Sequence, residues 1–434
     1  MSPADIGVIG IVLLVILFLL RIPVAYVMLL IGFAGFAYVS SLGSALSILG
    51  KEFWAVFSSY SLSVLPMVVF MGTIAFHSGI SGRIYDVAYK FVGHYRGGLA
   101  LATNLACAAF GAMCGSTIAG AAAMGKVTLP EMERYHYDKS LATGCVAAAG
   151  SLAILIPPSG ILIIYGIIVE ESIGKLFAAG ILPGILLTFL FAITIFVLCR
   201  LKPELAPAGS KTSWKERLAS TTGVIEMALL FIFVMGGLFI GWFTPTEAGA
   251  AGAAGALVLS LVRRGLSWQG FAAAVGETVR ISAMVYLIVA GATVFGRFMA
   301  VSRIPFELSE FVGGLDIAPG IIMGLIIFGY LIGGCFMDAL AMITLTVPIL
   351  HGVILNLGFD SVWFGVMIVL VVEMGAITPP VGINVYTIKG VAPDVPLGTI
   401  FRGIFPFLIA IVVCAVLLVI FPQIVLFLPN LITY

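Results

Sequence analysis

Charged residues are scarce in this sequence. Asp, Glu, Lys and Arg make up 9% of its 434 residues, whereas hydrophobic residues make up 62%. A soluble globular domain carries about 25% charged residues, so this composition excludes an ordinary soluble enzyme or binding module. Apolar runs of 15 to 25 residues recur along the chain, and about 20 such residues cross a bilayer. The chain is therefore predicted to be an all-α, multi-pass membrane protein.

Cysteine and histidine are also scarce, with six and four residues. The cysteines fall singly inside apolar segments, without paired spacing or a nearby histidine, so neither a disulfide framework nor a zinc site is expected. The sequence has no phosphate-binding loop, no HExxH and no G-x-S-x-G, which excludes the common ATPase and hydrolase signatures. We predict no enzyme activity, no cofactor and no nucleic-acid partner.

The long hydrophobic runs define the membrane spans. The first run follows Asp5, without a basic flank before it or a small-residue cleavage site after it. It is therefore predicted to be a retained span and not a signal peptide. Ten spans are expected near residues 6–20, 22–41, 63–80, 140–168, 176–199, 222–242, 245–262, 281–300, 362–390 and 404–428.

Two further apolar stretches, residues 98–130 and 318–350, are predicted to be re-entrant hairpins. With a periplasmic N-terminus and hairpins that enter and leave on one side, 17 of the 21 basic residues become cytoplasmic, which satisfies the positive-inside rule. These are Arg21, Arg83, Lys90, Arg96, Lys126, Arg134, Lys139, Arg200, Lys202, Lys211, Lys215, Arg217, Arg263, Arg264, Arg280, Lys389 and Arg402. The four on the other side are Lys51, Lys175, Arg297 and Arg303. Both termini are then periplasmic.

An internal repeat divides the chain. The motif "ILIPPSGILIIYG" (154–166) matches "GAITPPVGINVYT" (375–387) in its double proline, and three other motifs recur in the same order. Each copy contains five spans and one hairpin, so the second copy begins on the opposite side and the repeats are predicted to be inverted. The first repeat is expected to cover residues 1–201, a cytoplasmic linker 202–221, and the second repeat 222–434.

The double prolines predict broken helices, because proline lacks an N–H and disfavours helix in the preceding residue. Irregular backbone at membrane depth is tolerated where it is buried in protein or lines a wet cavity, and the freed carbonyls and amides suit cations and anions. Small or oxygen-bearing residues flank both breaks and occupy both hairpin tips: Ser151, Ser159, Thr378, Asn384, Gly115, Ser116, Thr117, Gly333, Gly334 and Asp338. They predict two oxygen clusters suited to sodium, with an anionic substrate between them. A simple packing kink is the alternative for each break.

Two acidic residues, Asp338 and Glu373, fall inside the apolar stretches of the second hairpin and the second broken helix. An ionisable side chain at membrane depth is costly to bury and is therefore a functional hypothesis by default. For Asp338 we predict cation binding or stabilisation of the hairpin tip. For Glu373 a functional role and a carboxylate bonded to neighbouring amides both stay open.

At this point the motifs resemble a known family. "GSTIAGAAAMG", "IPPSGILIIYG", "LFAAGILPG", "CFMDALAMITLTVPI" and "ITPPVGINVYTIKGVA" are similar to the large membrane subunit of tripartite ATP-independent periplasmic (TRAP) transporters. The resemblance implies a sodium-driven importer of the bacterial inner membrane with an elevator mechanism. It also implies organic-acid substrates, such as C4-dicarboxylates or sialic acids, and two partners: a small four-helix membrane subunit, expected as a separate polypeptide, and a periplasmic substrate-binding protein.

The resemblance also implies site residues, by position. The first sodium site would involve Ser116, Thr117, Gly150, Ser151 and Pro157. The second would involve Gly333, Asp338, Gly375, Thr378 and Pro379, and substrate would lie near Ser159 and Asn384. Three positions depart from the family pattern: Gly120 where an aspartate is frequent, "AAGS" where a serine pair precedes the break, and His351 where a proline is common. These departures affect ligand details of the first site more than the fold.

Two other functions are compatible with the sequence. One is a stand-alone sodium-coupled carboxylate or ion transporter that uses the same inverted repeats without a binding protein. The other is a membrane scaffold that transports nothing, for which the duplicated helix breaks serve no evident purpose.

Overall fold

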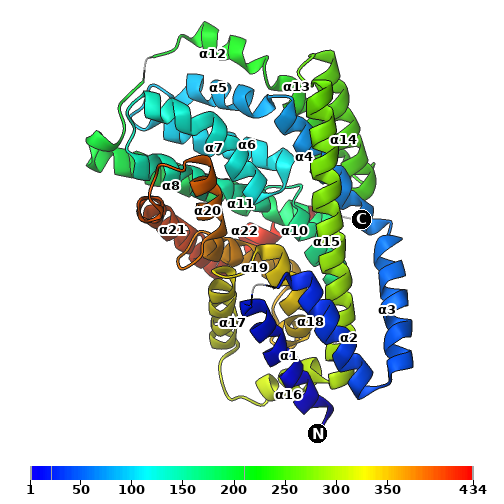
Figure 1. Ribbon diagram of the computed structural model, residues 1–434. Helices are drawn as coiled ribbons and strands as arrows, with labels where there is room; N and C mark the ends of the chain where they lie inside the picture. The colour runs from blue at the N-terminus through cyan, green and yellow to red at the C-terminus, as the bar shows by residue number, and fades with distance from the viewer. Residues whose placement is uncertain (1, 21, 210, 433–434) are drawn as a thin grey trace.

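The described part of the chain is helical throughout its regular structure. A computed structural model describes residues 2–20, 22–209 and 211–432, and Arg21, assigned above to the cytoplasmic side, lies outside them. Within these ranges the regular elements are all helices, and one isolated backbone bridge joins Arg96 to Ala208. Figure 1 shows an elongated bundle with the N-terminus near one end. The all-α prediction is confirmed.

The first half of the chain supplies the helices α1 to α11. Their bounds are α1 Pro3–Leu19, α2 Val24–Val39, α3 Leu42–Phe57, α4 Val64–His77, α5 Ile80–Val92, α6 Gly98–Cys114, α7 Thr117–Arg134, α8 Lys139–Gly150, α9 Leu152–Leu155, α10 Gly160–Val169 and α11 Ile173–Leu201. A 3₁₀ turn, Ser61–Ser63, precedes α4.

The second half supplies α12 to α22. Their bounds are α12 Trp214–Thr221, α13 Ile225–Phe239, α14 Pro245–Val262, α15 Trp268–Ser302, α16 Ile304–Gly313, α17 Pro319–Gly334, α18 Ala339–Asn356, α19 Ser361–Ala376, α20 Ile383–Val391, α21 Leu397–Ile420 and α22 Gln423–Leu426. Two 3₁₀ turns, Pro203–Leu205 and Pro429–Leu431, lie at the ends of the halves.

Each of the ten predicted spans overlaps at least one helix, and the two that contain a double proline are divided, 140–168 among α8, α9 and α10 and 362–390 between α19 and α20. Each predicted hairpin is a helix pair, α6–α7 and α17–α18. By length and composition, six helical segments of the described chain can cross a membrane alone. The number is eight when α3 with α4, and α12 with α13, each count as one bent span. Five more apolar helices are shorter: α1, α2, α6, α17 and α19. The chain is therefore a multi-pass membrane protein.

Three elements differ from the sequence prediction. Helix α3 lies between the spans predicted at 22–41 and 63–80, where no element was predicted; Ser41 caps it by accepting a hydrogen bond from Ser44 N at 3.2 Å. Helix α12 occupies the end of the predicted 202–221 linker. Helix α15 begins at Trp268, thirteen residues before the span predicted at 281, because Ser267 caps it by accepting a hydrogen bond from Gly270 N and the helix continues through Glu277 and Arg280.

One group of helices forms a scaffold, which we define as α1–α4 and α13–α15. The 35-residue helix α15 packs along α2, α3 and α4, and α14 packs on α4 and α13. Helices α2 and α15 approach closely at Gly32, where an added Cβ would lie 2.7 Å from the Phe295 backbone nitrogen. Figure 1 shows α15 as the long green helix beside α2 and α3.

Most of the other helices form a second group, the hairpin unit, which we define as α6–α11 and α17–α22; α5, α12 and α16 belong to neither group. Each hairpin packs against the first part of its own broken helix, α6 on α8 and α17 on α19. Each also packs against the second part of the other broken helix, because α7 contacts α20 and α18 contacts α10. This crosswise arrangement brings both tips and both breaks together within one unit.

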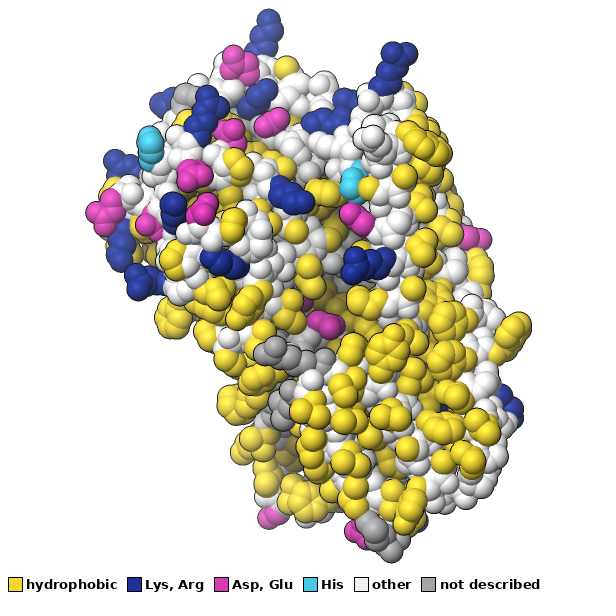
Figure 2. Space-filling model, in the orientation of Figure 1, with side chains coloured by type: hydrophobic (Ala, Val, Ile, Leu, Met, Phe, Trp, Pro, Cys, Tyr) yellow, Lys and Arg dark blue, Asp and Glu magenta, His cyan; other side chains and the backbone are white. Residues whose placement is uncertain are grey.

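Basic side chains gather at one end of the molecule. Figure 2 shows most of the visible Lys and Arg at the end where α5 and α12 lie in Figure 1, whereas the opposite half of this face is largely apolar. This distribution agrees with the charge asymmetry read from the sequence.

The closest helix crossing of the hairpin unit predicts a stability effect. Helices α8 and α21 meet at Gly144 and Gly403, where a Cβ on either glycine would overlap the backbone of the other helix. We expect Gly144→Ala to lower the Tm in detergent, because overpacking costs about 1–3 kcal/mol. The matched control is Gly296→Ala on α15, which has open space around it and should keep or raise the Tm, since Ala favours helix by about 1 kcal/mol over Gly. Equal Tm values for the two variants would contradict the close contact between α8 and α21.

Candidate functional site

Each double proline interrupts a helix. In the first half α9 ends at Leu155, and α10 begins at Gly160 after Pro157 and Pro158. In the second half α19 ends at Ala376, and α20 begins at Ile383 after Pro379 and Pro380. Both Pro–Pro peptide bonds are cis. The structure therefore contains both predicted breaks, and they follow from the missing N–H of proline.

The two hairpin tips use the same local device. Ser116 precedes α7 and accepts a hydrogen bond from Ala119 N at 3.4 Å, while Asp338 precedes α18 and accepts one from Ala341 N at 3.0 Å. Both residues thus cap the second helix of their hairpin, where the unpaired N–H groups carry partial positive charge. Gly115 makes the first turn with a φ of +59°, a conformation that favours glycine.

Each tip lies directly against a broken helix. A Cβ added to Gly115 would lie 2.7 Å from the Pro158 carbonyl oxygen. In the second half, a Cβ added to Gly334 would lie 2.6 Å from the Val372 carbonyl oxygen, and one added to Gly375 would lie 2.6 Å from the Gly334 carbonyl carbon. Glycine is required at these places because backbone meets backbone.

The residues assigned to the first sodium site are brought together around the first tip. Gly150 packs against α7, since an added Cβ would lie 2.7 Å from the Ala121 Cβ. Ser151 is buried, and its hydroxyl donates to the Ala148 carbonyl at 2.6 Å, which leaves the lone pairs of its oxygen available. Pro157 forms the break itself, and the carbonyl oxygen of the next residue, Pro158, lies against Gly115 of the tip. That these oxygen atoms bind sodium stays a prediction.

The residues assigned to the second site are likewise close together. Gly375, at the end of α19, lies against Gly334 of the tip, and Gly333 lies beside the Met342 side chain. The Thr378 hydroxyl donates to the Met374 carbonyl at 2.6 Å, as Ser151 does in the first half. The prolines differ between the halves, because Pro157 is buried and Pro379 is exposed.

Glu373 links the two halves. Its side chain is 3% exposed, and its polar neighbours are Thr117, from the first tip, and Asn384, from the second broken helix. The Asp338 carboxylate is near enough to act on its charge. Glu373 Oε2 and both amide atoms of Asn384 have no hydrogen-bond partner among the described residues, and an unpaired buried polar atom costs about 1–3 kcal/mol. The predicted substrate residue Asn384 and the undecided Glu373 therefore share one polar cluster.

Ser159 belongs to the first broken helix. It is fully buried and caps α10 by accepting a hydrogen bond from Leu162 N at 3.4 Å. In the second half the equivalent helix α20 begins after Gly382, which has a φ of +65°. Each break thus ends at the N-terminus of a half-helix.

The two tips meet the scaffold differently. The first tip lies against α4, where a Cβ added to Gly72 would lie 2.8 Å from the Cys114 Cα. Between the second tip and the scaffold lies a cavity of about 990 Å³, lined by α2 and α15 on one side and by Phe336, Asp338, Val381 and Tyr386 on the other. The structure therefore has one tip closed on the scaffold and the other facing open space.

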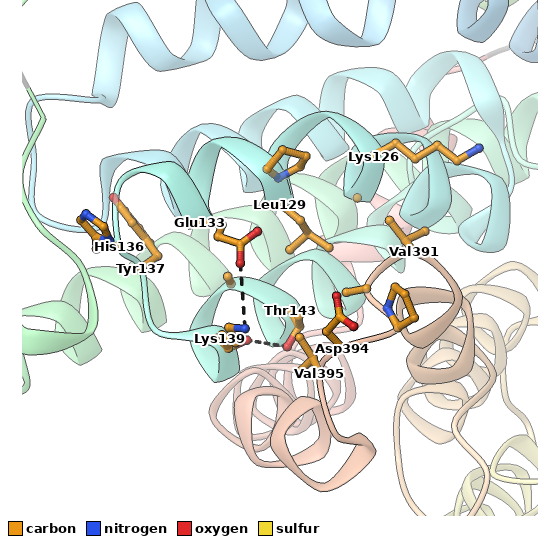
Figure 3. Close-up of a pocket in the computed structure, with 15 residues that line it drawn as sticks. Lys126, Leu129, Glu133, His136, Tyr137, Lys139, Thr143, Val391, Asp394 and Val395 are labelled. Atoms are coloured by element: carbon orange, nitrogen blue, oxygen red, sulfur yellow. Dashed lines mark hydrogen bonds and ion pairs between the residues drawn. The ribbon is translucent and has the colours of Figure 1, made fainter.

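A second cavity, of about 650 Å³, lies at the basic end of the hairpin unit. Figure 3 shows Lys126 and Glu133 on α7, Lys139 at the start of α8 and Asp394 in the loop after α20 around it. Lys139 Nζ lies 3.9 Å from Glu133 Oε1, and both side chains are exposed. This cavity contains none of the residues assigned to the sodium or substrate sites.

Comparison with known proteins decides the family. The model of the tripartite ATP-independent periplasmic transporter, DctM component, matches residues 11–424. The chain belongs to this family. The resemblance stated from the motifs is confirmed, and the chain is a large permease component of a TRAP transporter and not an enzyme.

The relatives cover nearly all of this permease. The C4-dicarboxylate TRAP transporter large permease protein of Pseudomonas aeruginosa is 35% identical over 372 residues, 86% of each chain. The sialic acid TRAP transporter large permease protein of Vibrio cholerae is 33% identical over 410 residues, 94% of this chain and 95% of the other. A solved structure, the YdaH transporter of Alcanivorax borkumensis, has a TM-score of 0.62 at 14% identity, over 88% of this chain and 89% of the other, which shows similarity of fold alone.

Some residues of the open cavity were not identified from the sequence. Tyr26 on α2 and Tyr386 on α20 line it, together with apolar side chains of α15 such as Met284. Tyr386 falls inside the quoted motif "GAITPPVGINVYT", four residues after Gly382, so its helical spacing from the break was the available signal. Tyr26 is more than 300 residues away along the chain, and no local pattern connects it to the site.

The contact between the first tip and its break predicts a measurable difference between two glycines. Gly115→Ala should lower the stability of the folded protein in two ways: through the positive φ, which costs about 1–2 kcal/mol, and through the contact of the new Cβ with the Pro158 oxygen. Gly79→Ala has a similar φ of +75° and open space around it, so its stability is lowered only by the positive φ. We therefore expect Gly115→Ala to lower the Tm more than Gly79→Ala. An equal loss in both variants would show that the tip does not press on the break.

Proposed function

We propose that this permease is the membrane subunit of a sodium-driven, binding-protein-dependent importer of carboxylate-bearing organic acids. The observation that carries the proposal is the asymmetry of the hairpin unit, in which two similar tip-and-break pairs meet the scaffold in different ways. The first tip is closed on α4, and the second faces a cavity of about 990 Å³. A transporter that opens its site to one side at a time needs such a difference between two similar gates.

Sodium coupling is supported by the chemistry at the tips. Sodium is a hard cation that takes oxygen ligands, as calcium and magnesium do. Each break interrupts the helical hydrogen bonds and so frees backbone carbonyls. Ser151 and Thr378 add hydroxyl oxygens there, since each already donates its hydrogen to its own helix. Asp338 adds a carboxylate at the second tip only, so we infer that the two cation sites differ in charge.

An anionic substrate is supported by the half-helices. Helices α10 and α20 both begin at the breaks, next to Ser159 and Asn384, and a helix N-terminus favours negative charge. Among the described residues neither amide atom of Asn384 has a hydrogen bond of normal geometry, although the side chain lies beside Glu373, so the amide can bind a ligand. The named relatives transport C4-dicarboxylates and sialic acid, which are carboxylate-bearing acids.

An elevator movement of the hairpin unit against the scaffold follows from this account. The crosswise packing of α7 on α20 and of α18 on α10 ties both tips into one body. Movement of that body would carry the whole site past α4 and α15. It would also give the predicted inversion of the repeats a function, since each tip would then serve one side of the membrane.

The tripartite family description implies two further components. We infer a small four-helix membrane subunit and a periplasmic substrate-binding protein as partners. The basic end of the molecule is then cytoplasmic, both termini are periplasmic and the bilayer is the bacterial inner membrane.

Uptake by proteoliposomes tests the proposal as a whole. The permease, reconstituted with its small subunit, should accumulate a radiolabelled C4-dicarboxylate or sialic acid only with an inward sodium gradient and the matching binding protein. Uptake without a binding protein would favour the stand-alone transporter, and equal uptake with sodium or potassium would overturn sodium coupling. Absence of uptake for every organic acid, with folded protein in the vesicles, would favour the scaffold.

A variant pair tests the second cation site without knowledge of the substrate. A ligand that binds only the folded state stabilises it by RT ln(1 + [L]/Kd), about 1.4 kcal/mol at ten times Kd. We expect NaCl, but not KCl or choline chloride at equal ionic strength, to raise the Tm saturably in the wild type. In Asp338→Asn the rise should weaken markedly, although Asn still caps α18.

The control is Asp360→Asn. Asp360 caps α19 by accepting a hydrogen bond from Trp363 N at 2.9 Å and does not line the open cavity. This variant should keep the full sodium response. An unchanged response in Asp338→Asn would remove Asp338 from the site.

A further inference from the structure

Helix α12 carries two large apolar side chains on one exposed side. Trp214 is 68% exposed and Leu218 is 63% exposed, and residues four apart lie on the same side of a helix. The helix is stabilised at its N-terminus, where Ser213 and Glu216 form a capping box. Single exposed apolar residues are ordinary on a protein surface, so the meaning of this pair depends on where α12 lies.

One side of α12 packs on α5. Arg217 lies on that side, and its Nη2 donates to Nδ1 of His94, the second residue after α5, at 3.3 Å. The Arg217 guanidinium also lies over the Trp214 ring, 4.9 Å from its centroid. Each residue turns a helix by about 100°, so Trp214 and Leu218 come next to the contact side and Lys215 comes after them. Helix α12 therefore has one side on protein, an apolar side beside it and a basic residue beyond.

The junction of α12 with α13 gives the level of α12 relative to the membrane. Arg263, which follows the last residue of α14, donates to the Thr222 carbonyl and to Glu226 Oε2, both at 2.7 Å. Charged groups at the end of a span lie where the span leaves the hydrocarbon core. Helix α12 ends at Thr221, directly before this cluster, and its axis is bent by 53° from that of α13. Helix α12 therefore turns away from the span at the membrane boundary.

The apolar side of α12 continues into an exposed apolar side of α13. Ile225, Leu229 and Ile232 are all exposed, and they recur at the spacing of one helix side. Leu218 lies seven residues before Ile225, the same interval that separates Ile225 from Ile232. An exposed apolar side of a span lies within the bilayer, against lipid chains or the span of another subunit. The apolar side of α12 is therefore the continuation of a surface that lies in the membrane.

The residue types in and around α12 suit the headgroup region. Residues 211–221 contain three basic residues and one acidic residue: Lys211, Lys215, Arg217 and Glu216. Tryptophan is enriched at membrane interfaces, and basic residues near a membrane surface are attracted to anionic lipids. Trp268 begins α15 five residues after Arg263 and is also exposed, so a second exposed tryptophan lies at a boundary of the same kind. Figure 1 shows α12 beside α5 at the end of the molecule where basic side chains gather in Figure 2.

We propose that α12 is an interfacial helix, which lies along the membrane surface at the basic end of the molecule with Trp214 and Leu218 in the lipid headgroup region. An apolar side flanked by basic residues is typical of such helices. A soluble partner protein would also cover the two side chains, but it would not account for the continuity with α13. Helix α5 connects α4 of the scaffold to α6 of the hairpin unit, so α12 holds this connection next to the bilayer. The proposal is independent of the transported substrate and of sodium.

Spin-label accessibility tests the proposal on the full-length permease. Leu218→Cys is labelled with a nitroxide and reconstituted in liposomes of phosphatidylcholine and phosphatidylglycerol in equal amounts. Oxygen is enriched in lipid and a nickel chelate in water, so the ratio of the relaxation enhancements that they cause reports the surroundings of the label. We expect this ratio at Leu218→Cys to exceed that at Ala219→Cys several-fold. Ala219 is an exposed residue of the same helix, about 100° further round it.

A second label position keeps the test decisive if one variant misfolds. Trp214→Cys lies on the same side of α12 as Leu218 and should give the same high ratio. The six native cysteines are buried, so the wild-type protein, treated with the same label, supplies the background signal. A ratio at both positions as low as that at Ala219→Cys would place α12 in water and overturn the proposal. Low accessibility to both reagents at these positions would show a protein contact and would also overturn it.

Discussion

The structure depends on one constraint: backbone N–H and C=O groups at membrane depth must find partners, because lipid offers none. Two double prolines interrupt helices there, and a hairpin tip packs against each interruption. Gly115 lies against the Pro158 carbonyl, and Gly334 lies against the end of α19. Irregular backbone at membrane depth is tolerated where it is buried in protein, and each break packs against a tip.

Crosswise packing joins the two hairpin tips and the two broken helices into one hairpin unit. Hairpin helix α7 contacts α20, and α18 contacts α10, so neither tip can move far without the other half. Glu373 reinforces this link, since it lies beside Thr117 of the first tip and Asn384 of its own broken helix. In this structure the first tip contacts α4 closely, while a cavity separates Asp338 at the second tip from the scaffold. Both features belong to the same position of the hairpin unit.

The sequence predicted the parts that follow from local chemistry. The double prolines gave both breaks, the apolar runs gave the helices, and the small residues at 115–117 and 333–338 gave the tips. It did not predict α3, whose Lys51 and Glu52 obscured an amphipathic helix, nor the early start of α15 at Trp268. It also left Glu373 undecided and missed Tyr26, because their significance comes from contacts between residues far apart in the chain. Such contacts are set by tertiary packing, which no local pattern records.

The most direct test of the central claim, that the hairpin unit moves as one body against the scaffold, is a pair of spin-label distances. One pair joins Glu133, on α7, to Arg264, next to α14; the other joins Glu133 to Gly398, on α21 within the hairpin unit. All three positions are exposed. The account predicts that sodium together with a transported substrate changes the distance distribution from Glu133 to Arg264 and leaves that from Glu133 to Gly398 unchanged. A change confined to the second pair, or no change in either, would contradict it.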